Sequence, residues 1–355
     1  MKIHKYTGID VKSEITYRIR SLFFILSILL LISFMLDLFL GSVLIGPGDV
    51  FRALFYPTGD ISETIILKFR LPKAVTSLAV GIALSTSGLQ MQTLFRNPMA
   101  GPYVLGISSG ASLGVAMILL GFSADITFGN IGTIGNWSMV AASWAGAGIV
   151  MALIMIISAR VKNIMTVLII GIMLASGISA IVSIMQYFSS ESMLKAYIVW
   201  TMGSLGNLTA EQLKILTISV SAGVIICFLS VKMLNAMLLG ETYAGSIGLN
   251  VRTARFVVIA GTSTLAGTVT AFCGPIGFLG IAVPHIVRII FRTADHRILI
   301  PGTILAGGII MLISDMISQL PGSDSVLPVN SVTALVGIPV VIWVILQNRK
   351  YSEIF

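Results

Sequence analysis

Residues Gly277–Arg297 read GFLGIAVPHIVRIIFRTADHR, an apolar run of helix length that contains Pro284, His285 and Arg288 and ends in a polar turn. Residues of these types are costly inside a bilayer, so in membrane proteins they face a bundle interior or a cavity, or lie near a helix end. Two interpretations stay open for this segment alone: a packing kink with an arginine that reaches the membrane surface, or a functional site.

Composition decides the class of protein. Hydrophobic residues make up 56% of the 355 residues and charged residues only 10%, whereas soluble domains carry about 25% charged residues. A spanning helix needs about 20 apolar residues, and the 35 glycines suit close packing of membrane helices. The sequence predicts an all-α polytopic membrane protein with ten transmembrane helices, over Leu22–Leu40, Ala74–Leu94, Val104–Leu120, Met139–Ile157, Met165–Phe188, Leu213–Met233, Arg255–Phe272, Ile276–Phe291, Ile300–Ile317 and Val332–Leu346.

The first run is predicted to be a retained span, because it is longer than the apolar core of a signal peptide and no small-residue cleavage site follows it. We therefore expect a cytoplasmic N-terminal arm at 1–21, a single ten-helix transmembrane domain at 22–347 and a cytoplasmic tail at 348–355. Six of the 22 basic residues fall on the outer side of this topology and the other sixteen on the inner side, which supports two cytoplasmic termini. Topology thus accounts for the net charge of +8, and no nucleic-acid partner is expected.

Three connecting segments stand out. Gly101–Gly106 (GPYVLG) and Gly274–Gly280 (GPIGFLG) each open a span but in opposite orientation, which predicts an inverted repeat of the second to fifth spans in the seventh to tenth. Ala196–Met202 is too short to span and is predicted to be a half-helix at the outer face. Leu238–Arg255 (LLGETYAGSIGLNVRTAR) is predicted to form a short amphipathic helix at the cytoplasmic surface, with an ordinary connecting loop as the alternative.

No catalytic residue set is visible. The chain lacks GxSxG, HExxH and phosphate-loop patterns, and its three histidines lie in separate segments. Cys227 and Cys273 fall in or beside spans and are expected to be packing residues, and no metal site is expected. Asp37 and Asp315, both near helix ends, are the acids that an ion-coupled transporter would use. The chain is therefore predicted not to be an enzyme.

Polar motifs follow one another in a fixed order: RLPK (Arg70–Lys73), GLQMQTLFRNPMAGP (Gly88–Pro102), LGISSG (Leu105–Gly110), WTMGSLG (Trp200–Gly206), LGETYAGSIG (Leu239–Gly248), GPIGFLGIAVPHIVR (Gly274–Arg288), TADHR (Thr293–Arg297) and LPVNSVTALVGIPVVIW (Leu327–Trp343). In this order they resemble the FecCD family of ABC-transporter permeases, the type II importers of ferric siderophores, haem and cobalamin. The resemblance covers nearly the whole chain beyond residue 40.

The resemblance implies a homodimer in the bacterial inner (plasma) membrane, with two ATP-binding cassette ATPase subunits inside and a periplasmic substrate-binding protein outside. ATP and magnesium would belong to the ATPase chain, and this chain would bind no cofactor. The family's ATPase-coupling positions match Gly240, Glu241, Ala244, Gly245 and Gly248, and its binding-protein docking positions match Arg70 and Lys73. A third basic docking contact would fall near Pro321–Asn330, where this chain has neither Arg nor Lys.

The remaining family sites concern translocation. The gate matches Asn163 and Ile164, although the small hydroxyl residues of the family are replaced here. The fifth span would line the path through Met173, Ser176, Ser179, Ser183 and Gln186. Pro284, His285 and Arg288 would have a structural or coupling role, tying the eighth span to the ATPase-facing elements.

The predicted function is the membrane permease of an ATP-driven importer for a ferric siderophore or a similar large metal chelate, with cobalamin or haem as the alternative substrate. An ion-coupled secondary transporter is the alternative from another class, disfavoured by the scarcity of acids within the spans. A channel or a structural membrane protein would leave Gly240–Gly248 without a role. The sequence does not decide the substrate, the residues of the path and gate, or whether the partner permease is identical or merely related.

Overall fold

The computed structural model describes residues 8–41, 45–56, 59–121, 133–161, 163–319 and 326–348. The first seven residues of the predicted arm and the predicted tail beyond residue 348 lie outside these ranges. The described elements are helical: α1 (Gly8–Phe39), α2 (Pro47–Phe55), α3 (Ile61–Ile65), the π-helical turn η1 (Ile66–Arg70), α4 (Leu71–Leu94), α5 (Ile107–Leu119), α7 (Thr133–Arg160), α8 (Ile164–Phe188), α9 (Glu191–Thr201), α10 (Ala210–Leu229), α11 (Val231–Leu238), α12 (Glu241–Ser246), α13 (Val251–Cys273), α14 (Leu279–Phe291), α15 (His296–Ser318) and α16 (Val329–Asn348).

The predicted spans fall on α1, α4, α5, α7, α8, α10, α13, α14, α15 and α16 in chain order. Within the described ranges, six of these are long and apolar enough to cross a membrane, namely α1, α7, α8, α10, α13 and α15, and α5, α14 and α16 are shorter apolar helices. The chain is therefore a multi-pass helical membrane protein. The sixth predicted span is wrong at its end, because the helix breaks at Ser230, where α10 gives way to α11.

Two other boundaries differ from the sequence prediction. The half-helix predicted over Ala196–Met202 is α9, which begins five residues earlier at Glu191. The amphipathic helix predicted within Leu238–Arg255 is confined to α12, since Asn250 accepts a hydrogen bond from the Thr253 amide and so caps the start of α13. Residues 251–255 thus belong to the long helix α13. The apolar pattern alone did not reveal the Asn250 cap that marks its start.

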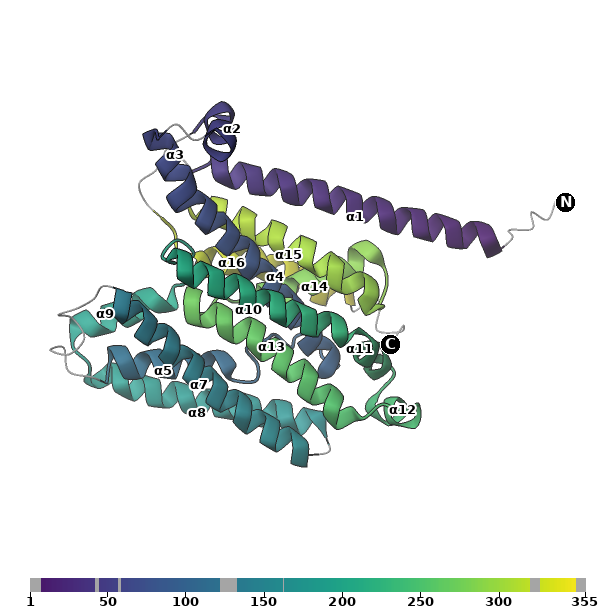
Figure 1. Cartoon of the computed structure of the whole chain (residues 1–355). Coiled ribbons are helices and arrows are strands. Elements are labelled where there is room, and N and C mark those ends of the chain that lie inside the picture. The colour runs from purple at the N-terminus through teal and green to yellow at the C-terminus, as the bar shows by residue number, and fades with distance from the viewer. Residues whose placement is uncertain are drawn as a thin grey trace.

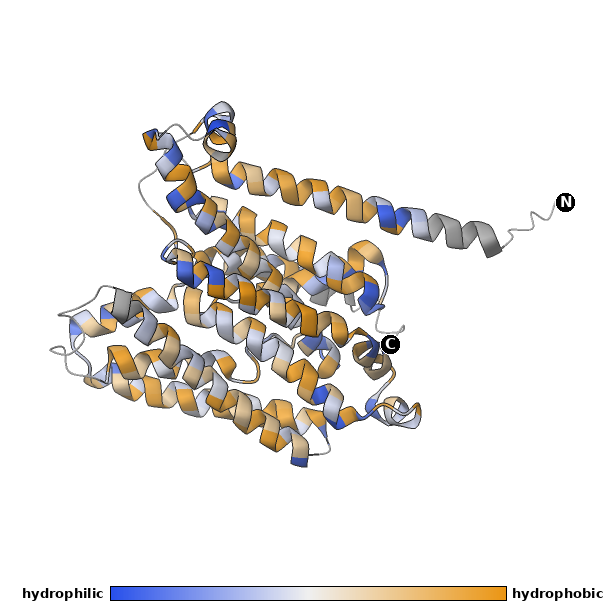
Figure 2. Cartoon of the chain, viewed as in Figure 1, coloured by the Kyte–Doolittle hydropathy of each residue, from blue (hydrophilic) through white to orange (hydrophobic). Residues whose placement is uncertain are grey.

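The helices run between two ends of the molecule (Figure 1). One end carries α11, α12 and the start of α1, and we call it the α12 end. The opposite end carries α2, α3 and α9, and we call it the α9 end. Apolar residues cover the helices between these ends, and several of the most polar residues lie close to one end or the other (Figure 2). A bilayer would therefore lie across the middle of the helices.

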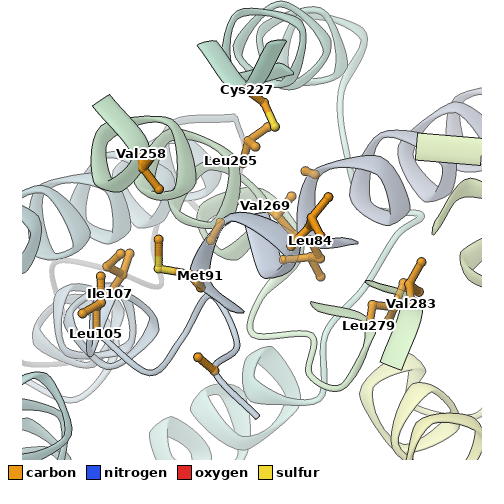
Figure 3. Close-up of a cluster of buried hydrophobic side chains, with 14 of the residues drawn as sticks. Leu84, Met91, Leu105, Ile107, Cys227, Val258, Leu265, Val269, Leu279 and Val283 are labelled. Atoms are coloured by element: carbon orange, nitrogen blue, oxygen red, sulfur yellow. The ribbon is translucent and has the colours of Figure 1, made fainter. Parts of the chain in front are cut away.

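Helices α4, α10, α13 and α14 meet in the main core, where Leu84, Cys227, Leu265 and Val283 are fully buried (Figure 3). Small residues let neighbouring helices approach closely, as expected in a membrane. A Cβ added to Gly110 of α5 would lie 2.5 Å from the Gly146 carbonyl oxygen of α7. Since real Cβ atoms do not approach backbone so closely, this contact requires glycine.

Candidate functional site

The predicted coupling segment forms a separate short helix at the α12 end. Gly240 and Gly248 bracket α12 with φ angles of 104° and 90°, a region that favours glycine. Ala244 is fully buried and fastens the helix to the body, whereas Tyr243 and Ile247 are 50% and 57% exposed. These two apolar side chains are four residues apart and share a face. The segment therefore presents a small apolar surface outward.

The first residue of α12 is paired with α13. Arg255 donates from Nε to Glu241 Oε1 over 2.8 Å and from Nη2 to Glu241 Oε2 over 2.6 Å, a bidentate ion pair. Its Nη1 also donates to the carbonyl oxygen of Val161, at 2.9 Å, directly after α7. Arg255 is only 4% exposed, so this side chain joins three segments inside the protein.

The Pro284, His285 and Arg288 motif lies on α14 and contacts α4. Pro284 has no amide hydrogen, so it leaves the Gly280 carbonyl without its helical donor, and Gln92 Nε2 donates to that oxygen at 3.4 Å. Arg288 Nη1 donates to Gln92 Oε1 at 2.6 Å. The contact of His285 Nε2 with the Pro98 carbonyl oxygen, at 2.9 Å, places the ring hydrogen on Nε2, since a carbonyl only accepts. Arg288 thus contacts α4 itself, and His285 contacts the segment that follows α4.

The polar turn at the start of α15 continues this network. Asn235 of α11 donates to Asp295 Oδ1 at 2.7 Å and accepts from the His296 amide at 2.9 Å. His296 Nδ1 donates to the same Asn235 oxygen, which leaves Nε2 to accept the hydroxyl of Thr93 at 2.8 Å. Partial burial alone would raise the pKa of Asp295, but hydrogen bonds from the Arg297 amide and Asn235 outweigh it, so that pKa lies below its ordinary value.

The predicted docking residues lie at the α9 end, and both are engaged within the chain. Arg70 is 8% exposed and donates from Nη1 to the carbonyl oxygens of Leu38, at 2.8 Å, and Phe39, at 2.9 Å. Lys73 forms an ion pair of 2.9 Å with Asp315, which is fully buried. Asp37, 2% exposed, lies close to the Asp315 carboxylate.

A cavity of about 490 Å³ opens beside this charge cluster. Arg70, Lys73 and Asp315 line it together with Gln319 and Phe69. Lys73 is more accessible from the cavity than Arg70, because its side chain remains 21% exposed. Docking of a partner at Arg70 and Lys73 stays a prediction, and it would have to compete with the contacts described here.

The predicted path residues lie along one side of α8. Met173 is 69% exposed, and Ser176, Ser179 and Ser183 are exposed as well, at spacings of three and four residues that share a helix face. The hydroxyls of Ser176 and Ser183 donate to carbonyls of their own helix, so they offer little polarity to a passing ligand. Gln186 is half-buried near the end of the stripe. This face would form a weakly polar wall.

The predicted gate residues start the same helix. Asn163 caps α8, since its Oδ1 accepts a 2.9 Å hydrogen bond from the Met165 amide, and Ile164 is buried. Across the described part of the chain, no group of three or more His, Cys, Asp or Glu side chains could hold a metal ion. The arrangement therefore offers a polar network at one end, a charge cluster at the other and an apolar face between them.

Residues 29–347 match the FecCD transport family. The chain belongs to this family. Among curated relatives, the "Vitamin B12 import system permease protein BtuC" of Citrobacter koseri is 35% identical over 326 residues, which is 92% of this chain and 94% of the relative. The protein of the same name from Escherichia coli O9:H4 has the same identity and coverage.

Two solved structures share the fold of this family member. One, described as an inward-facing conformation of a metal-chelate type ABC transporter, superposes with a TM-score of 0.79 at 29% identity and covers 92% of this chain and 99% of that one. PsaBC from Streptococcus pneumoniae superposes with a TM-score of 0.53 at 15% identity over 80% of this chain and 93% of that one, a likeness of fold alone.

Sequence reasoning missed three residues that organise the α12 end of this permease-family fold: Gln92, Asn235 and Arg255. Gln92 carried a signal, because an amide inside an apolar run needs a partner in the membrane. No such signal was present for Asn235 and Arg255, since each lies near a helix end, where polar residues are common. The partners of Asn235 and Arg255 come from segments 14 to 97 residues away.

Proposed function

We propose that this chain is the membrane permease subunit of an ATP-driven importer for a large metal chelate. The family match over residues 29–347 carries the proposal. The chain itself would catalyse no reaction and hold no cofactor, and ATP with magnesium would bind to a separate ATPase subunit. The exposed helix α12 at one end and the exposed face of α8 between the ends support a transport role.

The proposed topology has ten spans within a single domain at residues 22–347, with both termini cytoplasmic. The helices α1, α4, α5, α7, α8, α10, α13, α14, α15 and α16 would cross the inner membrane in turn, so the α12 end would be cytoplasmic and the α9 end periplasmic. An inverted repeat is supported by α5 and α14, which have 13 residues each. Each follows an irregular segment that begins with Gly-Pro, as in transporters with discontinuous helices.

At the cytoplasmic end, α12 would dock into the ATPase. Its exposed Tyr243, Gly245 and Ile247 form the surface that would enter the partner, while Gly240, Glu241 and Ala244 hold the helix to the body. Two ATPase subunits would serve a dimer of permeases. The strongly exposed face of α8, where Met173 is 69% exposed, supports a second permease copy across a shared path.

At the periplasmic end, Lys73 and Arg70 would meet acidic residues of a substrate-binding protein, with Lys73 as the more accessible of the two. The path would run along Met173, Ser176, Ser179, Ser183 and Gln186 toward a gate at Asn163 and Ile164. A wide, weakly polar wall suits a bulky chelate, because transport requires that no site bind it strongly.

For the substrate we propose cobalamin first and a ferric siderophore or haem second. Sequence reasoning placed the siderophore first on family frequency. The names of the relatives, which are 35% identical over 92% of this chain, support the cobalt chelate instead.

The test reconstitutes the permease with its ATP-binding and substrate-binding partners in lipid vesicles. Uptake of radiolabelled cyanocobalamin and of a ferric hydroxamate chelate is measured with ATP, without ATP, and with an imposed proton gradient alone. We expect uptake of one chelate that depends on ATP. Uptake driven by the proton gradient without ATP would favour the secondary transporter instead.

A further inference from the structure

We propose that Arg255 is a positioning residue that joins the ATPase-docking helix α12 to the turn between α7 and α8. The proposal rests on the function proposed above, in which α12 receives the ATPase and the start of α8 is the gate. Movement of α12 would reach the gate at the start of α8 through the contacts of Arg255.

The contacts of one guanidinium make this connection. Its Nε and Nη2 hold both carboxylate oxygens of Glu241, the first residue of α12, at 2.8 and 2.6 Å. On the other side, Nη1 reaches the carbonyl oxygens of Val161, at 2.9 Å, and Ser158, at 3.5 Å. Ser158 belongs to the last turn of α7, and Asn163 caps α8 two residues beyond Val161. One planar group therefore contacts the docking helix and the gate turn together.

The chemistry of arginine makes the connection stiff. The guanidinium is planar and always charged, and its donors have a fixed fork geometry. Arg255 is 4% exposed, so water competes little for these bonds. A shift of Glu241 would have to break two charge-assisted bonds or carry the guanidinium with it, and the guanidinium holds the end of α7. A lysine could pair with Glu241 or with the carbonyls but could not reproduce both geometries.

A second contact of the same region leads elsewhere. Arg96, just after α4, donates from Nη2 to the Leu238 carbonyl oxygen at 3.1 Å, and its guanidinium lies against Gly240. That contact holds the segment before α12 to α4. The two arginines thus fix the docking helix to different parts of the permease, and the Arg255 contact is the one that ends at the α7–α8 turn.

The test measures movement of this turn without using a transported ligand. Arg160→Cys places a thiol at the exposed last residue of α7, and the native cysteines are buried. The rate of its reaction with a fluorescent maleimide is compared between the nucleotide-free complex with the ATPase and the complex trapped with ATP and vanadate. With Arg255 present, we expect the rate to change at least about fivefold, within the usual range of coupling between sites.

Arg255→Met should reduce this change to less than about twofold, below the usual range of coupling, while the ATPase still binds. The double variant Glu241→Arg with Arg255→Glu restores an ion pair, but a glutamate cannot donate to the α7 carbonyls. It should therefore remain uncoupled, which separates transmission from mere placement of α12. Arg252→Met is the matched control, since Arg252 is exposed in the same turn of α13 and should leave the change intact.

Several outcomes would overturn the proposal. A native-sized response in Arg255→Met, or a full rescue by the charge exchange, would show that the α7 contact transmits nothing. If Arg255→Met fails to assemble, Glu241→Ala decides, because it removes the contact between α12 and Arg255 and leaves the contact between Arg255 and the end of α7 in place. A native response there refutes the link, and a lost response supports it. If the unsubstituted permease does not bind the ATPase at all, the proposed function fails, independently of these variants.

Discussion

Lys73→Met should destabilise the permease strongly, because it removes the cation paired with a carboxylate that is fully buried. Lys73 Nζ lies 2.9 Å from Asp315 Oδ1, and the Asp315 side chain has no exposed surface. Removing one partner of a buried ion pair typically costs about 3 to 5 kcal/mol. Gln319 Nε2, at 3.3 Å from Asp315 Oδ2, and Ser318 Oγ, at 3.3 Å from Oδ1, are neutral and offset little of this.

Proton uptake sets a ceiling on the cost. The folded variant can neutralise Asp315 by binding a proton, and for an aspartate of ordinary pKa about 3.9 this costs about 4 kcal/mol at pH 7. Asp37 and Lys73 are the charged groups that interact with the Asp315 carboxylate. The unfolded chain does not bind the proton at pH 7, so the penalty should fall by about 1.4 kcal/mol for each pH unit below 7.

The assay uses the two native cysteines as reporters of unfolding. Cys227 and Cys273 are the two cysteines of the chain, and they are 0% and 2% exposed. A thiol-reactive fluorophore labels them only when the core opens, and its rate follows the open population when closing is faster than labelling. A loss of about 3 to 4 kcal/mol should raise the labelling rate about 150-fold to 1,000-fold at pH 7. The ratio to the native rate should be about tenfold smaller at pH 6.

Two variants control the interpretation. Lys68→Met removes an exposed lysine of η1 and should leave the labelling rate nearly unchanged. Lys73→Met combined with Asp315→Asn removes both charges of the ion pair and should recover most of the loss, because the carboxylate that lost its cation is then absent. The reasoning is wrong if Lys73→Met labels within about threefold of the native rate, or if the double variant labels as fast as the single one.

Ala244→Trp should reduce ligand-stimulated ATP hydrolysis at least about tenfold without preventing insertion, since Ala244 is fully buried on the face of α12 that packs on the body; normal stimulation would exclude a docking role. Gly110→Leu should destabilise the α5–α7 contact by about 1 to 3 kcal/mol, read as faster thiol labelling, and an unchanged rate would contradict the close packing. Asp295 has a lowered pKa, so its stabilising contribution is present at neutral pH and is lost as the pH falls below about 4; Asp295→Asn should remove that part of the acid dependence of tryptophan-fluorescence melting. Arg288→Met should cost about 1 to 3 kcal/mol of stability, because it takes the donor from Gln92, while the relative uptake of competing chelates stays unchanged; altered selectivity would move this residue into the path.

The sequence by itself determined the class of protein and the position of almost every long helix. Runs of about 20 apolar residues are a local property, because each membrane helix satisfies its own backbone hydrogen bonds. The segment that holds α12 was also predicted, within Leu238–Arg255, although the prediction did not use Gly240 and Gly248, whose positive φ angles bound the helix. Boundaries that depend on a cap or a break, such as Asn250 and Ser230, were predicted less well, because an apolar pattern does not register them.

Only the tertiary structure decided which polar residues act together. Arg70 and Lys73 looked like free surface cations in the sequence, yet the fold places Asp315 beside Lys73 and the carbonyls of Leu38 and Phe39 beside Arg70. Arg255 looked like an ordinary helix-end arginine, and the fold places Glu241 and the end of α7 around it. A buried charge takes its partners from whatever segments pack around it, and that packing joins residues far apart in the chain, so local sequence cannot specify it.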